Sequence, residues 1–439
     1  MPIADRRLPN EENARKRIIR AGWVAPMEGP PIRDGAVVFE RGVILDVGAA
    51  RDIAARYPGA AVADRSGETL LPGLINAHTH LELSEFACEV PPASFVDWVL
   101  GLVPRGPMNL EAIRQSVARL VPIGIAQCLR FGVTCVGDIS RHCTVSRPLL
   151  QNGPLRVVSY GEVLAMGQRR AFLDERIVMA TDDRFESRWL RTAITPHAPY
   201  SVEMDGYRRC VEAARSRAMP IATHLAETPD EAPFLADHSG PFRRLWDALN
   251  AWDEDIPRWV GGPIRFAEAV GLLGYPRTLL AHVNYCDDTE LEILARGRAS
   301  VVYCPRTHAF FGHPPHRWRD MLARGINVAV GTDSCASSPD LNLADELRLL
   351  RRLAPDLSGD VIWKMATVNA AKAVDMEGRI GILRSGAFAD FVLFPGVDER
   401  PLASILDQGT AAREVWIDGI VVRSATGNGA PGTKPQAII

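Results

Sequence analysis

Short apolar runs recur through the middle of this 439-residue chain, and most of them end on a residue that can take part in acid–base or metal chemistry. The residues that end the eight runs are His78, Asp138, Glu162, His197, His224, His282, Cys304 and Asp333. Helix-like stretches, such as residues 111–130 and 343–353, lie between them. Strands that alternate with helices favour parallel βαβ units, and eight such units predict a closed (β/α)8 TIM barrel, an α/β fold.

The polar residues fall where the chemistry of such a barrel is expected. Catalytic groups of a TIM barrel cluster at the carboxyl ends of its strands. A doubly wound open sheet is the alternative, but the chain contains no Gly-x-Gly-x-x-Gly or P-loop sequence to favour it. The barrel is therefore the predicted fold of the central region.

Both ends of the chain carry strand-like segments without such helices. Residues 35–48 predict a β-hairpin with Arg41 and Gly42 at its tip, and residues 389–394 and 414–422 are again strand-like. We therefore predict a small β-sandwich domain built from both termini. The predicted divisions are residues 1–68 for the first part of the sandwich, 69–378 for the barrel, and 379–439 for the rest of the sandwich and a disordered tail.

Composition and charge argue against several classes of partner. A net charge of −3 gives no reason to expect nucleic acid or an acidic membrane, and no apolar run approaches the ~18 residues that a membrane helix needs. The first 20 residues are charged and lack the apolar core of a signal peptide. Eight cysteines without a Cys-x-x-Cys pair fit reduced thiols, so a cytoplasmic location is expected. The sequence leaves homo-oligomerisation open.

A His-x-His pair, His78 and His80, follows the first apolar run. Side chains at i and i+2 of an extended segment point the same way, so both imidazoles can reach one metal ion. His224 and Asp333 end the fifth and eighth predicted strands. Imidazole and carboxylate ligands suit zinc or iron, and three histidines plus one aspartate leave a position for water. These four residues are therefore the candidate metal ligands.

Four motifs resemble those of the amidohydrolase superfamily, closest to its mononuclear branch of cytosine- and adenosine-deaminase-like and chlorohydrolase-like enzymes. The motifs are Asn76-Ala77-His78-Thr79-His80, His224-Leu225-Ala226-Glu227-Thr228, Ala281-His282 and Gly331-Thr332-Asp333-Ser334. The resemblance implies the metal ligands His78, His80, His224 and Asp333. It also implies that Glu227 is the proton-shuttling acid/base, and that His282 orients the attacking water together with Asp333.

The scarcity of lysine bears on the number of metal ions. Binuclear members of the superfamily often bridge two ions with a carboxylated lysine. Between Lys16 and Lys364 the chain contains no lysine, so a single divalent ion is expected. Zn2+ is favoured, and Fe2+ accepts the same ligands. Glu162 is the one residue we considered as another bridge, but a structural or substrate role is favoured for it.

The resemblance implies an aminohydrolase that releases ammonia from a small-molecule substrate, an aminopurine nucleoside or a related N-heterocycle. Residues 76–84 look most like aminodeoxyfutalosine deaminases, so aminodeoxyfutalosine is a candidate substrate. A cyclic-amide hydrolase or a chlorohydrolase on the same fold is the alternative, because these enzymes share the metal site. A non-catalytic scaffold is the remote alternative, and such proteins lose metal ligands, whereas this chain retains all four.

Four residues are candidates for substrate binding. The resemblance implies that His197 contacts the substrate and that Trp98 places its ring over the base. Val96 stands where the family carries an acidic residue that holds ribose hydroxyls, which argues against simple adenosine-like recognition. Arg306 and His308 are predicted to face the pocket mouth and bind an anionic group, since arginine pairs well with carboxylates. A solvated loop position is the alternative for Arg306.

Overall fold

The computed structural model describes residues 15–86, 93–102 and 109–424. The predicted disordered tail and Cys88 fall outside these residues. Within the described part, no helix is both long enough and apolar enough to cross a membrane. Seven cysteines lie in it and all seven are free thiols, as predicted.

Eight parallel strands form the central sheet, and each pairs with its neighbours in the sequence. The strands are β5 (Leu74–Thr79), β6 (Val133–Ser140), β7 (Arg156–Val163), β8 (Leu190–Pro196), β9 (Ile221–Leu225), β10 (Thr278–His282), β11 (Ser300–Tyr303) and β12 (Val328–Val330). The amide of Asp333 donates to the carbonyl of His78 at 3.1 Å, which joins the end of β12 to β5. The predicted (β/α)8 barrel is thereby confirmed.

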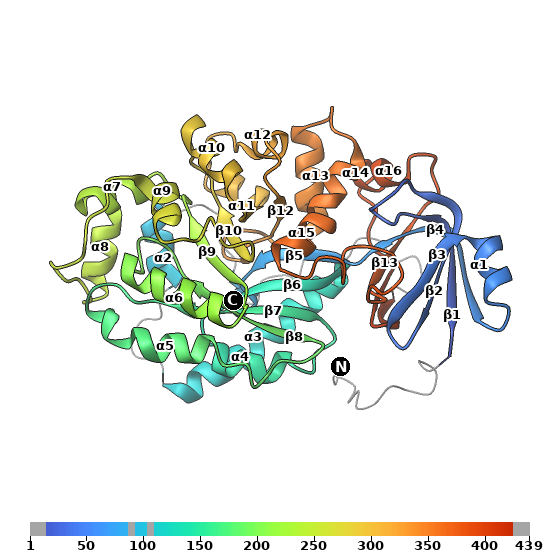
Figure 1. Ribbon diagram of the computed structural model, residues 1–439, viewed down its shortest axis with the longest axis horizontal. Helices are drawn as coiled ribbons and strands as arrows, with labels where there is room; N and C mark the ends of the chain where they lie inside the picture. Colours follow the sequence, from blue (N-terminus) through green and yellow to red (C-terminus); the bar gives the residue numbers. More distant parts are fainter. Residues whose placement is uncertain (1–14, 87–92, 103–108, 425–439) are drawn as a thin grey trace, which may run out of the picture.

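Helices surround the barrel, as Figure 1 shows. Those between and after the barrel strands are η2 (Leu81–Leu83), α2 (Phe95–Leu102), α3 (Leu110–Arg130), α4 (Cys143–Leu150), η3 (Gly167–Phe172), α5 (Leu173–Ala180), α6 (Met204–Ser216), α7 (Glu231–Asp237), α8 (Pro241–Ala248), α9 (Gly262–Ala269), α10 (Asp288–Arg296), α11 (Pro305–Phe310), α12 (Trp318–Ala323), α13 (Leu343–Leu353), α14 (Gly359–Met365), α15 (Val368–Ala373) and α16 (Pro401–Asp407). Their starts follow local chemistry: Asp287 and Glu290 form a capping box at α10.

Strand residues alternate between two apolar clusters, which is the pattern of a strand packed on both faces. On β10, Leu279 and Ala281 belong to the interior cluster, whereas Leu280 packs with the layer that includes the helices. Many of the interior residues are small, such as Ala222 and Ala329. This filled interior leaves the strand ends as the place for a site.

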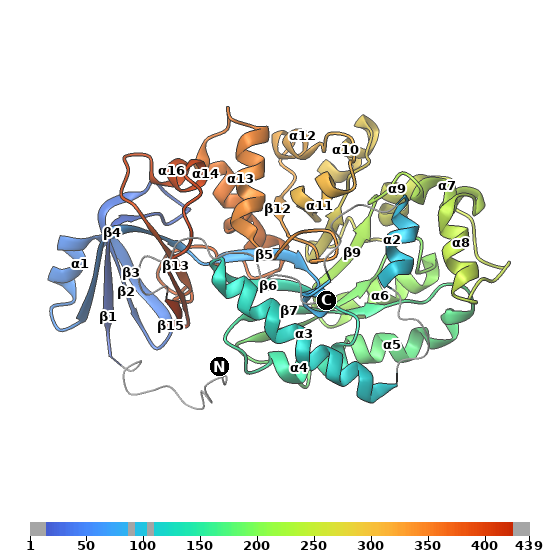
Figure 2. The same cartoon turned by 180° about the vertical axis from the view of Figure 1, so that it is seen from behind.

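Segments from both ends of the chain form a second, seven-stranded sheet beside the barrel (Figures 1 and 2). Its strands are β1 (Arg17–Val24), β2 (Ile32–Glu40), β3 (Val43–Ala49), β4 (Ala61–Pro72), β13 (Phe391–Pro395), β14 (Glu414–Ile417) and β15 (Ile420–Ser424), and α1 (Ala50–Arg56) lies next to them. The predicted hairpin is β2–β3, and both tip residues, Arg41 and Gly42, have the positive φ of a type I′ turn. The prediction of a small β-domain built from both termini is confirmed, and the strands of this predicted sandwich form one seven-stranded sheet.

The two sheets are joined at Gly73, where β4 continues into β5. The Gly73 amide donates to the carbonyl of Asp390 at 3.0 Å, and a Cβ there would lie 2.1 Å from Thr134 Oγ1. Arg156 on β7 also forms a buried bidentate pair with Asp390, at 2.5 and 3.0 Å. These contacts hold the barrel against the second sheet. The divisions at residues 68 and 378 stay predictions.

Candidate active site

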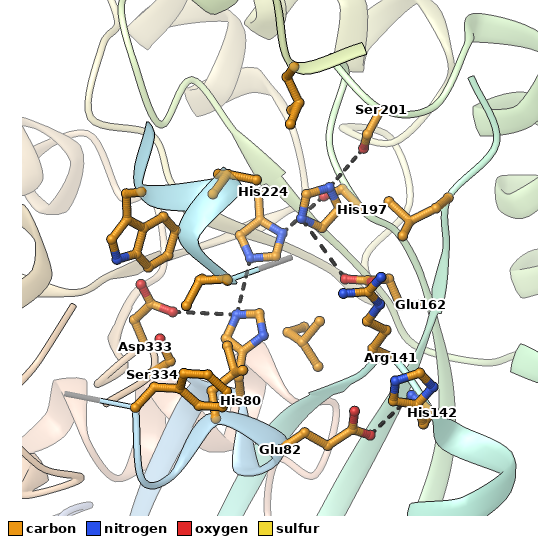
Figure 3. A pocket seen from close by; sticks show the side chains of 18 of the residues that line it. His80, Glu82, Arg141, His142, Glu162, His197, Ser201, His224, Asp333 and Ser334 are labelled. Atoms are coloured by element: carbon orange, nitrogen blue, oxygen red, sulfur yellow. Dashed lines mark hydrogen bonds and ion pairs between the residues drawn. The ribbon is translucent and has the colours of Figure 1, made fainter. Parts of the chain in front are cut away.

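Three histidines and an aspartate converge at the carboxyl ends of the barrel strands. The ligand atoms of His78, His80 and His224 all lie within 4.8 Å of one another. Asp333 Oδ1 lies 3.4 Å from His80 Nε2 and 3.8 Å from His78 Nε2 (Figure 3). The four predicted metal ligands are thus brought together around one point.

Close packing between β5 and β12 brings His78 and Asp333 near each other. The Asn76 side chain donates to Thr332 Oγ1 at 2.7 Å and accepts from the Thr332 amide at 3.1 Å. At Gly331 an added Cβ would lie 2.7 Å from the carbonyl oxygen of His78, so only glycine permits this approach. The sequence therefore fixes the distance between the segment that carries His78 and the segment that carries Asp333.

The donor set fits a divalent metal ion. Both ring nitrogens of His78 are buried without a hydrogen-bond partner in the described structure, which is costly unless a ligand meets them. Burial lowers the pKa of His78 and of His224 well below the usual range, and the neighbouring histidines lower it further. Both imidazoles are therefore neutral, which is the form that binds metal.

Neighbouring groups orient the ligands. His224 Nδ1 donates to the carbonyl of His197 at 3.0 Å, so its Nε2 carries the lone pair that faces the site. The Ser337 hydroxyl donates to Asp333 Oδ2 at 2.9 Å, which leaves Oδ1 toward the histidines. Sequence reasoning missed Ser337, because a serine in a loop carries no signal of its partner.

Glu227 and His282 form the second group of the site. Together with Asp333 they place three ligand atoms within 4.8 Å of one another, and His282 Nε2 lies 3.4 Å from Glu227 Oε1. Burial raises the pKa of the Glu227 carboxyl well above its usual range, and the Asp333 charge raises it further. Burial lowers the pKa of His282 to about 4. Glu227 can therefore hold a proton while His282 stays neutral.

Two further residues fix the segment that carries Glu227. The buried Glu231 carboxylate accepts the amides of Ala226, Glu227 and Thr228. Asn284 Nδ2 donates to the carbonyl of Glu227 at 3.0 Å. Neither residue was predicted. The only signal in the sequence is that Glu231 lies four residues after Glu227. This spacing does not distinguish a residue that binds the amides of 226–228 from an ordinary carboxylate at the start of a helix.

A cavity of about 280 Å³ opens beside the metal ligands. Trp98 and His197, both predicted to bind substrate, line it. Trp98 Nε1 donates to the carbonyl of Ala336 at 3.0 Å, which fixes its ring. Other aromatic residues of the lining are Phe95, Tyr200 and Trp246. An apolar slot of this size, with the metal ligands at one side, suits a flat heterocycle.

Polar residues line another part of the same cavity, and Glu162 is the one among them that the sequence had singled out. They are Glu82, Arg141, His142, Glu162 and Arg169 (Figure 3 labels all but the last). No ion pair within the described residues engages Arg141 or Arg169. Burial lowers the pKa of Arg169, and the charge of Arg141 lowers it further. Both guanidinium groups therefore line the cavity without an ion pair to a described residue, and that of Arg169 lies over the Trp246 ring, 5.6 Å from its centroid.

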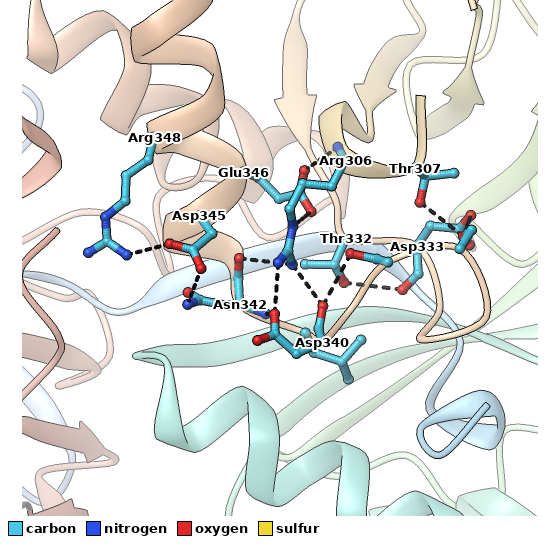
Figure 4. Close-up of polar contacts among 12 residues, drawn as sticks. Arg306, Thr307, Thr332, Asp333, Asp340, Asn342, Asp345, Glu346 and Arg348 are labelled. Atoms are coloured by element: carbon cyan, nitrogen blue, oxygen red, sulfur yellow. Dashed lines mark hydrogen bonds and ion pairs between the residues drawn. The ribbon is translucent and has the colours of Figure 1, made fainter. Parts of the chain in front are cut away.

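Arg306 and His308 do not line this cavity, contrary to expectation. The segment after β11 forms helix α11 instead of an open mouth loop, and Arg306 turns to α13 (Figure 4). Its side chain donates to Glu346 at 2.6 Å and to Asp340 Oδ1 at 2.8 Å, and we name Arg306, Asp340 and Glu346 the Arg306 clamp. The His308 side chain is buried next to Tyr303, at 5.4 Å between ring centroids.

Comparison with known proteins agrees with this geometry. Residues 69–422 match the amidohydrolase family. The chain belongs to this family. The match spans the whole barrel and reaches into the C-terminal strands of the second sheet. The prediction of a hydrolase of this family is confirmed.

Similar proteins bear deaminase names. The aminodeoxyfutalosine deaminase of Deinococcus radiodurans is 31% identical over 364 residues, which cover 80% of this chain and 84% of that protein. The 5-methylthioadenosine/S-adenosylhomocysteine deaminase of Pyrococcus furiosus is 28% identical over 391 residues, 86% of this chain and 85% of that protein. A solved structure of an adenosine deaminase from Xanthomonas campestris, with bound zinc, has a TM-score of 0.75 at 25% identity and covers 92% of each chain.

Proposed function

We propose that this protein is a metal-dependent deaminase of an aminopurine nucleoside or a related N-heterocycle. The observation that carries the proposal is the juxtaposition of four metal-ligand side chains with the Glu227–His282 pair, 3.4 Å apart, beside an aromatic cavity. The deaminase names of the similar proteins support the same reaction.

His78, His80, His224 and Asp333 would hold one divalent ion, for which we propose Zn2+. When bound, such an ion acts as a Lewis acid and lowers the pKa of a water molecule toward ~7. The unpartnered nitrogens of His78 support this role, and so does the bound zinc of the Xanthomonas campestris structure. Zinc content measured by mass spectrometry, with iron as the competing result, tests the identity of the metal.

Glu227 would act as the acid and base of the reaction. Its carboxyl holds a proton in this buried setting and would donate it to a ring nitrogen of the substrate, which makes the adjacent carbon electrophilic. His282, neutral and fixed beside it, would orient the attacking water and accept its proton. Glu227, now a carboxylate, would take up the water proton from His282, 3.4 Å away, and deliver it to the departing amine. Ammonia then leaves, and the hydroxyl on the carbon returns its proton to Glu227.

We further propose that the substrate carries an anionic group away from the reacting ring. Arg141 and Arg169 face the cavity without an ion pair within the described residues, and guanidinium groups bind carboxylates well. Aminodeoxyfutalosine carries a carboxylate, whereas 5-methylthioadenosine is neutral. The arginines therefore favour an acidic nucleoside such as aminodeoxyfutalosine over its neutral counterpart.

Ammonia release tests the proposal. The zinc-loaded protein is incubated with aminodeoxyfutalosine, S-adenosylhomocysteine, 5-methylthioadenosine, adenosine, guanine and cytosine. Release from one nucleoside, reduced about 10²- to 10⁴-fold in Glu227→Gln with metal retained, is the expected result. Silence across the panel with metal bound would refute the deaminase and favour hydrolysis of a ring amide or a halide, which chloride and carboxylate assays detect.

The divisions of the chain and its location also remain proposals. We propose divisions after residues 68 and 378, with residues 69–378 as the barrel, since strands from both ends of the described chain share one sheet. The seven cysteines within the described residues are free thiols and support a reducing compartment such as the cytoplasm. Limited proteolysis tests the division, and size-exclusion chromatography with light scattering measures the oligomeric state.

A further inference from the structure

His282 reaches the active site from an unusual backbone conformation. Leu280, two residues earlier on β10, packs away from the barrel interior, and strand alternation would send His282 the same way. Instead its Nε2 lies 3.4 Å from Glu227 Oε1. The φ angle of His282 is +71°, so a left-handed backbone turns the imidazole toward the site.

This conformation needs support from outside the strand. The Val283 amide contacts the carbonyl of Ala281 at 3.2 Å, an i to i+2 contact that spans His282 as in a γ-turn, and Val283 itself has a φ of +53°. A backbone with two successive non-glycine residues in the left-handed region is strained. Such backbone persists only where neighbouring groups hold it.

On the β9 side the Val283 amide also donates to the carbonyl of Leu225 at 2.9 Å, and His316 makes the contact on the β11 side of this turn. Its Nε2 donates to the carbonyl of His282 at 2.9 Å. The β10–β11 ladder ends at the pair Ala281 and Val302, so this carbonyl lies beyond the last registered pair. The His316 ring is 9% exposed and stacks on Tyr303, at 4.0 Å between centroids and 17° between planes. The donor is thus held rigidly at the end of β11.

We propose that His316 is a positioning residue, which fixes the His282 peptide so that its imidazole faces Glu227 and the metal site; the proposal rests on the proposed function. His316 does not line the cavity, and it is not one of the metal ligands. Because a carbonyl can only accept, Nε2 must carry the proton, and burial lowers the pKa of His316 to about 3, which keeps the ring neutral. The contact therefore persists throughout the pH range of an assay.

Its neighbour His313 provides a matched control. This histidine belongs to the same segment, and its Nδ1 lies 2.9 Å from the Tyr285 hydroxyl. Within the described residues it makes no hydrogen bond to His282. His313→Leu therefore removes a similar ring from the same segment while the His316 contact to the His282 carbonyl is retained.

Kinetics of three variants test the proposal. His316→Leu removes the donor, and His316→Gln retains an N–H near the position of Nε2. We expect His316→Leu to lower kcat about 10- to 100-fold with KM and zinc content nearly unchanged, because small misplacements of a catalytic group have effects of this size. His316→Gln should recover most of the loss, and His313→Leu should stay within about threefold of wild type. Wild-type kcat in folded, zinc-loaded His316→Leu would overturn the proposal.

A crystal structure of His316→Leu gives a readout that needs no substrate. The expected result is a His282 φ outside the left-handed region and a longer distance between His282 Nε2 and Glu227 Oε1. An unchanged His282 peptide would refute the positioning role, even if the wild type proved inactive on every nucleoside and the proposed function failed. If His316→Leu does not fold, His316→Asn takes its place in both experiments, because its amide is too short to reach the carbonyl.

Discussion

Two buried polar clusters follow neighbouring strands of the barrel, yet their chemistry differs. In the Arg306 clamp after β11, Glu346 accepts both the side chain and the backbone amide of Arg306. Asp340 and the carbonyl of Asn342 accept from the other guanidinium nitrogens. Around Asp333 after β12, both nitrogens of His78 and His282 Nε2 are buried without a hydrogen-bond partner in the described structure. A buried cluster whose polar atoms are all hydrogen-bonded stabilises the fold. A buried cluster with unpartnered polar atoms is expected to bind a ligand.

Removal of the metal from the unsatisfied cluster around Asp333 should have the largest effect of all on activity. Dialysis against a chelator should abolish ammonia release, and added Zn2+ should restore it. His78→Ala should impair this recovery, because the ion loses one of its four protein ligands and binds more weakly. The measurements are bound zinc and kcat/KM. Full activity in the metal-free protein would show that the unpartnered nitrogens serve another purpose.

Disruption of the Arg306 clamp should act on stability. Arg306→Ala leaves the Glu346 carboxylate buried without its partner, and breaking such a pair costs about 3–5 kcal/mol. The free energy of unfolding from urea titrations measures the loss. Arg319→Ala is the control, because its pair with Asp356 lies at the surface, with side chains 49% and 58% exposed. Equal losses in the two variants would contradict the assignment of the clamp as a buried structural element.

The two kinds of arginine differ in what the sequence reveals about them. Arg306 lies directly after a barrel strand, and from that position we predicted a role at the cavity mouth. The helix that begins at Pro305 turns it to Glu346, a partner 40 residues later in the chain. Arg141 and Arg169 carried no motif, and only the fold places them at the cavity. Partner choice over such separations cannot be derived from local pattern.

The positions of the metal ligands, in contrast, could be predicted from the sequence, because they follow from the fold. Once the strands and their order are known, the carboxyl ends of β5, β9 and β12 must meet at one face of the barrel. His78, His224 and Asp333 could therefore be grouped before the structure was known. The backbone at His282 could not, since a φ of +71° in a histidine leaves no trace in the sequence.

Loss of an unpaired arginine should act on binding and leave stability unchanged. Arg169→Met keeps most of the apolar stem and removes the charge. We expect kcat/KM for an acidic nucleoside to fall about 10- to 100-fold, because a hydrogen bond to a charged group contributes about 1.5–3 kcal/mol. Turnover of a neutral nucleoside should be unaffected. A similar loss with both substrates would mean that Arg169 shapes the cavity instead of binding an anion.

The last expected effect is confined to the pH dependence of stability and concerns Asp138, a buried carboxyl with one satisfied oxygen. Oδ1 accepts the Leu81 amide at 2.9 Å, and Oδ2 has no hydrogen-bond partner within the described residues. Burial raises the pKa of Asp138 to about 7 in the folded protein, against 3.8 for an ordinary aspartate. The folded state therefore binds a proton that the unfolded state releases, and stability present below pH ~4 is lost as the pH rises through ~7.

Asp138→Asn tests this pH dependence, since the amide does not ionise. Between about pH 4 and 7 the free energy of unfolding of the wild type should fall more steeply than that of the variant, by up to about 1.4 kcal/mol per pH unit. Urea titrations at pH 5, 6 and 7 measure both slopes. Equal slopes in the two proteins would show that the Asp138 carboxyl is already ionised in the folded state. An unpartnered buried carboxylate oxygen would then persist at a barrel strand without a proton or a ligand to stabilise it.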